Sequence, residues 1–172
     1  MPTPIPFAYF ITFTCYGARL HGDEAGSADR NHNIPGTPYL APNKSKSLFK
    51  ARLMKQAPYE LNLQRRDTVL QAIRDLCLRR GWKLLAAHVR SNHVHFVVSA
   101  QVVPERVMRD AKVQASRALD RTGVAGLAPR RWTRHGSTRY LWKAEDARSA
   151  VHYVLREQGE PMAVWENPTG IG

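Results

Sequence analysis

His93 and His95 are the residues whose type and spacing could do chemistry in this sequence. They lie in residues 82–99, where apolar and β-branched residues flank a short polar turn at residues 90–92. This pattern predicts a hairpin of two β-strands. Because side chains alternate between the two faces of a strand, both imidazoles would project from the same side and could share a metal ion. Two ordinary surface histidines are the alternative, since a pair supplies only two ligands.

The last predicted helix, residues 144–158, carries a second set of reactive side chains. Tyr153 lies well off its apolar stripe, at about 100° per residue, and Glu157 follows one turn later on the same side. With the two imidazoles, this carboxylate would form the mixed nitrogen and oxygen set that suits Mg²⁺ or Mn²⁺. A tyrosine beside such a metal could act as a nucleophile. A border tyrosine above a solvated glutamate is the alternative.

The charge of the chain favours a polyanionic partner. Lys and Arg number 26 against 14 acidic residues, a formal net charge of +12, and neutralising phosphates drives binding to nucleic acid. General solubility is the alternative. Basic residues beside an aromatic ring suit single-stranded nucleic acid. The candidate DNA contacts, in the helix expected from residue 104 and in the loop at 122–137, are Arg109, Lys112, Arg130, Arg131, Trp132 and Arg134.

The elements that would position these residues follow from apolar periodicity and from glycine and proline punctuation. Their order predicts an α+β fold with a ferredoxin-like antiparallel sheet and helices packed on one face. Residues 7–16 should be a central strand because they are dense in aromatic and β-branched types. The other expected strands are 59–63, the hairpin and 138–143, and the expected helices are 67–80, one beginning at Pro104, and 144–158.

The length of 172 residues predicts a single domain over residues 1–172. A long loop insertion at about 17–58 interrupts it, with a short helix conceivable at 47–56. The two cysteines have no Cys-x-x-Cys spacing, which indicates neither a disulfide framework nor a cysteine zinc site. No apolar run approaches about 18 residues, so we expect a cytoplasmic protein without a membrane partner.

The segment His93-Val94-His95 resembles the HUH motif, His-hydrophobic-His, of single-strand DNA endonucleases. With the preceding Ser91-Asn92 and the following Phe96, it is similar to small single-tyrosine insertion-sequence transposases, and most resembles their REP-associated tyrosine transposase relatives. Residues 10–17, 80–82 and 151–154 support the resemblance. The resemblance therefore covers most of the chain, and the HUH segment is its most specific part.

The resemblance implies that His93 and His95 are metal ligands and that Tyr153 is the nucleophile. Glu157 stands where relatives carry a polar third ligand, often Gln or Asn, and Ala115 stands three residues after Lys112 where some relatives carry a tyrosine. The implied activity is cleavage and rejoining of hairpin-flanked single-stranded DNA through a 5′-phosphotyrosine, with Mg²⁺ or Mn²⁺, by a monomer or homodimer. A domesticated, catalytically inactive protein that binds or regulates DNA hairpins is the alternative. An RNA-binding ferredoxin-like domain is a third hypothesis.

Overall fold

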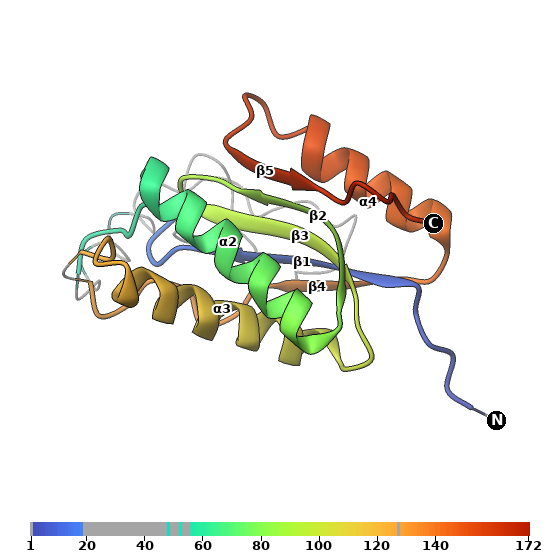
Figure 1. Cartoon of the computed structure of the whole chain (residues 1–172). Helices are drawn as coiled ribbons and strands as arrows, with labels where there is room; N and C mark the ends of the chain where they lie inside the picture. The colour runs from blue at the N-terminus through green and yellow to red at the C-terminus, as the bar shows by residue number, and fades with distance from the viewer. Residues whose placement is uncertain (1, 19–47, 49–51, 53–55, 127) are drawn as a thin grey trace.

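A five-stranded antiparallel sheet organises the structure, a computed structural model that describes residues 2–18, 48, 52, 56–126 and 128–172. The strand order is β4-β1-β3-β2-β5 (Figure 1). None of the helices in these residues is both long and apolar enough to cross a lipid bilayer. In chain order the elements are β1 (Ala8–Thr14), α2 (Leu63–Arg80), β2 (Lys83–Val89), β3 (His93–Ser99), α3 (Pro104–Arg121), β4 (Ser137–Leu141), α4 (Ala144–Arg156) and β5 (Ala163–Glu166).

Strand β3 occupies the centre of the sheet, between β1 and β2. It forms the predicted hairpin with β2, and the turn is closed by the Arg90 amide, which donates to the His93 carbonyl at 2.9 Å. On its other side, β1 places Thr12 opposite His95. The two histidines therefore lie on the central strand of the sheet, which is hydrogen-bonded on both sides.

Helices cover both faces of the sheet (Figure 1). Helices α2 and α3 pack together on one face, over a core that includes Ile11, Phe13 and Phe96. The apolar stripe of α4 packs on the opposite face, against Leu85 and Val97. The predicted α+β class with a ferredoxin-like antiparallel sheet is confirmed. The expectation that the helices share one face holds for α2 and α3 only, because α4 meets the side chains that alternate to the other side.

The chain departs from the expected elements just before α2 and near the end of the chain. Residues 59–63 form no strand; instead the Asn62 side chain accepts a hydrogen bond from the Arg65 amide at 2.9 Å and caps α2. Helix α2 therefore begins at Leu63, four residues earlier than expected. Strand β5 was not expected. Most of the segment 47–56, considered as a helix, and most of the insertion at 17–58 lie outside the described residues.

Candidate active site

His93 and His95 project from the same face of β3, as the spacing predicts. Their ring centroids are 4.4 Å apart and the ring planes are nearly perpendicular, at 77°. His95 is buried, at 5% exposure, whereas His93 is half-buried at the start of the strand. The pair therefore reaches from the interior of the sheet face to its rim.

Hydrogen bonds at Nδ1 orient both rings. Thr12 Oγ1 on the neighbouring β1 lies 2.8 Å from His95 Nδ1. The Asn92 side-chain oxygen lies 2.5 Å from His93 Nδ1. Metal-binding histidines are commonly oriented in this way by a partner on the second ring nitrogen. The local sequence thus supplies the group that holds His93, whereas the group that holds His95 comes from β1 through the pairing of the strands.

Tyr153 comes from α4, on the face of the sheet that carries the histidines. Its ring centroid is 6.1 Å from that of His95 and 5.9 Å from that of Phe10. The side chain is 39% exposed, so a macromolecular substrate could reach the phenol. The apolar stripe of α4 accounts for this position, because packing Val154 and Val151 against the sheet leaves Tyr153 at the border.

Glu157 does not join the two histidines in this arrangement. It is the C-cap residue that follows α4, and its carboxylate lies 2.9 Å from His152 Nδ1 on the exposed surface. Among the described residues, no three His, Cys, Asp or Glu side chains are grouped closely enough to hold a metal ion. The structure therefore brings together His93, His95 and Tyr153, while the expected third ligand turns to a neighbour on its own helix.

His88 is a buried histidine next to the site that the sequence reasoning missed, and its role is to position α4. It lies on β2 directly opposite His95 and is 1% exposed. Its Nδ1 donates to the Val154 carbonyl at 3.0 Å, and the Met162 amide donates to its Nε2 at 3.0 Å. Burial lowers the pKa of this imidazole, which agrees with a neutral ring that donates at one nitrogen and accepts at the other. A lone polar residue in the apolar run of β2 is the signal that could have found it.

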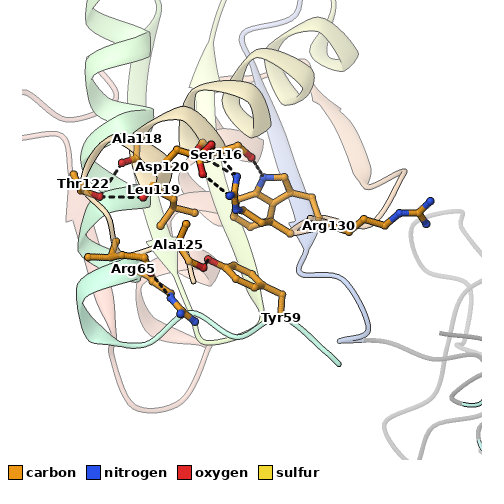
Figure 2. A network of polar contacts seen from close by, with 12 residues as sticks. Tyr59, Arg65, Ser116, Ala118, Leu119, Asp120, Thr122, Ala125 and Arg130 are labelled. Atoms are coloured by element: carbon orange, nitrogen blue, oxygen red, sulfur yellow. Dashed lines mark hydrogen bonds and ion pairs between the residues drawn. The ribbon is translucent and has the colours of Figure 1, made fainter. Parts of the chain in front are cut away.

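Arg131 and Trp132, two of the expected DNA contacts, instead hold their loop against α3 through hydrogen bonds to Asp120 and Ser116, which Figure 2 labels. The Arg131 side chain is only 14% exposed and forms an ion pair with Asp120. The Trp132 indole N–H donates to Ser116 Oγ at 2.9 Å, and its ring packs edge-on against Phe13 with centroids 5.0 Å apart. Both side chains are committed to internal contacts, so the position of Trp132 does not support a base-stacking role.

Lys112 is likewise engaged inside the protein. Its Nζ donates to the carbonyls of Thr133 and His135, at 2.9 and 3.0 Å, and burial lowers its pKa. It therefore shapes the loop before β4 more than it presents a charge to solvent. In Figure 2 the side chain of Arg130 points away from the polar network around it. The expected DNA contacts with exposed side chains are Arg109, Arg130 and Arg134.

Comparisons with known proteins support the resemblance drawn from the HUH segment. Residues 49–143, more than half of the chain, match the family model described as "Transposase IS200 like". No curated protein matches the chain. The matched region contains His93 and His95 and ends before α4, so it does not include Tyr153.

Two solved structures are similar to the chain at low sequence identity. One is a REP-associated tyrosine transposase bound to a REP hairpin, 13% identical, with a TM-score of 0.48, covering 91% of this chain and 70% of that one. The other is a protein from Deinococcus radiodurans R1 assigned as a transposase, 13% identical, with a TM-score of 0.48, covering 87% of this chain and 89% of that one. From the match of the family model, this chain belongs to the IS200-like transposase family.

Proposed function

We propose that this transposase is a metal-dependent tyrosine DNA strand transferase of the HUH type, which cleaves and rejoins hairpin-flanked single-stranded DNA in the cytoplasm. The observation that carries the proposal is the position of Tyr153, whose ring lies 6.1 Å from His95, beside His93. A candidate nucleophile and a pair of candidate metal ligands thus lie on the same face of the sheet. The tyrosine alone, or the two histidines alone, could equally be ordinary surface residues.

The donor set fits a divalent cation. His93 and His95 offer two nitrogen ligands on rings already oriented through Nδ1, and Mn²⁺ and Mg²⁺ accept nitrogen and oxygen donors together. Glu157 would supply the oxygen ligand after its carboxylate leaves His152 and turns to the metal. When bound, the cation would polarise the scissile phosphate.

The covalent step is a displacement at phosphorus. The Tyr153 hydroxyl oxygen attacks the scissile phosphorus and loses its proton to solvent, while the bond from phosphorus to the 3′ oxygen breaks. The departing oxygen takes up a proton and leaves as a free 3′-OH, and the 5′ end stays linked to Tyr153. The reverse attack by a 3′-OH rejoins the strand. The number of phosphoester bonds is unchanged, so no ATP is needed.

The substrate we propose is single-stranded DNA that folds into a hairpin, bound by a monomer or a homodimer. The net charge of +12 supports a polyanionic partner. Arg109, Arg130 and Arg134 are the candidate phosphate contacts, because their side chains are exposed.

The test is formation of a covalent adduct. The full-length protein is incubated with a labelled single-stranded hairpin oligonucleotide and Mn²⁺, and the products are separated on a denaturing gel. We expect an adduct that maps to the Tyr153 peptide by mass spectrometry and is absent from Tyr153→Phe. His93→Ala should also lose it, whereas His135→Ala, a control at an exposed histidine, should keep it. An adduct that persists in Tyr153→Phe would reject the assignment.

A hairpin-binding protein without cleavage is the second candidate function. The observation that favours it is the hydrogen bond between Glu157 and His152, which holds the expected third ligand away from His93 and His95. This function predicts hairpin binding that is unchanged by Mn²⁺ and by His93→Ala, with no nicking. A thermal shift with Mn²⁺ that disappears in His93→Ala would favour the strand transferase.

A further inference from the structure

We propose that β4 and the residues just after it form a binding track that guides single-stranded DNA to Tyr153. In this track Tyr140 and Trp142 stack bases, and Arg139 holds a phosphate. The inference rests on the proposed function and adds a binding surface to it. Strand β4 is an edge strand of the sheet and leads directly into α4 (Figure 1).

The track contains a stacked and exposed aromatic pair. Among the described residues, the most exposed large aromatic side chains are those of Tyr140, Trp142 and Tyr153, at 40%, 51% and 39%. Tyr140 and Trp142 have ring centroids 5.7 Å apart at an interplanar angle of 20°. The buried Tyr9 packs against Tyr140 with the two rings nearly perpendicular and their centroids 5.2 Å apart. Exposed rings held in this way form a preorganised platform for unpaired bases.

The strand register places Arg139 on the face of the sheet that carries the nucleophile. Arg139 pairs with Phe10 on β1, and directly opposed residues of paired strands point to the same face. The Phe10 ring lies 5.9 Å from the Tyr153 ring. Arg139 is exposed, and a guanidinium on this face is suited to a phosphate next to the scissile one. Tyr140, the next residue, points to the other side of the strand.

Nearby charges favour the same orientation of the DNA backbone. On the Tyr140 side, Glu105 accepts a hydrogen bond from Thr138 Oγ1 at 3.0 Å, which leaves a carboxylate near the platform. Phosphates are therefore favoured on the Arg139 side. Lys143 adds an exposed cation at the end of the track, although Asp146 accepts a hydrogen bond from its backbone amide. Bases would therefore lie on the Tyr140 side of β4, and phosphates on the Arg139 side.

The platform also supplies the stacking role that Trp132 does not. The Trp132 ring packs against Phe13 inside the loop, whereas the Trp142 ring is half exposed beside Tyr140. Stacking on these rings requires unpaired bases, so the preferred ligand is a single-stranded tail next to a hairpin and not the paired stem. An exposed sheet edge could instead pair with a second copy of this chain, and the experiment distinguishes the two.

The experiment compares two DNA ligands on full-length protein in the Tyr153→Phe background, so that binding is measured without cleavage. One ligand is a fluorescent hairpin with a single-stranded tail, and the other is the same hairpin without the tail. We expect Trp142→Leu to weaken binding of the tailed hairpin about 10-fold and to leave the blunt hairpin unchanged. Arg139→Gln should lower the slope of log affinity against log salt concentration for the tailed hairpin by about the value of one phosphate contact. Arg117→Gln, at an exposed arginine on α3, is the matched control.

Unchanged affinity of Trp142→Leu for the tailed hairpin would overturn the track. An equal loss of affinity for the tailed and the blunt hairpin would also overturn it. The same holds if sedimentation shows that the wild type is a dimer and that Trp142→Leu dissociates this dimer without changing DNA affinity. Failure of the proposed chemistry would look different: no adduct forms on Tyr153, yet tail binding still depends on Trp142 and Arg139.

Discussion

Replacing His88 by leucine is expected to destabilise the fold and to loosen the helix that carries Tyr153. The imidazole satisfies two backbone groups in the interior, the Val154 carbonyl near the end of α4 and the Met162 amide before β5. The last carbonyls of a helix have no partner within the helix, so the Val154 carbonyl depends on a group such as His88. Leucine fills a similar volume but can neither donate nor accept.

The magnitude follows from the two groups that lose their partner. A buried donor or acceptor left unsatisfied costs about 1–3 kcal/mol, so the two together should cost about 2–6 kcal/mol of unfolding free energy. Typical domains have a stability of about 5–15 kcal/mol, so this is a large fraction. His88→Asn should lose less, because its amide can still donate to Val154.

Urea denaturation followed by circular dichroism measures the effect. His135→Leu is the matched control, because that side chain is exposed, and it should change the unfolding free energy by less than about 0.5 kcal/mol. A His88→Leu protein whose stability also stays within about 0.5 kcal/mol of the wild type would refute the reasoning. Such a result would mean that water replaces the imidazole at both backbone groups.

Three further predictions concern the rest of the fold. Burial raises the pKa of the Cys15 and Cys77 thiols from 9.0 to about 12, so neither thiol should react with a thiol reagent until the protein unfolds. Because the unfolded chain loses these protons at a lower pH than the folded chain, the unfolding free energy should fall as pH rises above about 9. Labelling of the native protein would contradict this. Gly136→Ala should lower the melting temperature, because its Cβ would lie 2.5 Å from the Thr12 carbonyl oxygen; an unchanged melting curve would count against the close packing. Asn62→Ala should cost about 1 kcal/mol in urea denaturation, and Asn62→Ser should restore most of it; equal losses in both variants would exclude the cap.

The parts of the fold that were predictable from the sequence are those with strong local patterns. The density of aromatic and β-branched residues at 7–16 predicted β1, and Pro104 marked the start of α3 correctly. Strand β5 has only four residues, and it is stabilised by pairing with β2, far away in the sequence. Nothing in its own pattern could show that partner.

In the candidate site, too, some positions follow from local sequence patterns and others depend on tertiary contacts. A period of two places His93 and His95 on one face, and helical periodicity puts Tyr153 beside the apolar stripe; both follow from local geometry. The inward position of Trp132 depends on Ser116, a residue on α3 that sequence spacing does not bring near it. The position of Glu157 depends on how the chain leaves α4 and on its contact with His152. Tertiary contacts decide such details.

Helix α4 connects the two opposite edge strands of the sheet, β4 before it and β5 after it. The histidines, in contrast, belong to a hairpin whose pairing needs neither of these ends. A premature stop codon shortly after residue 158 would therefore leave both imidazoles in place but remove the far attachment of the helix with Tyr153. Under the proposed function, a chain shortened in this way is expected to bind hairpin DNA without forming the Tyr153 adduct, and to compete with the full-length chain for that DNA.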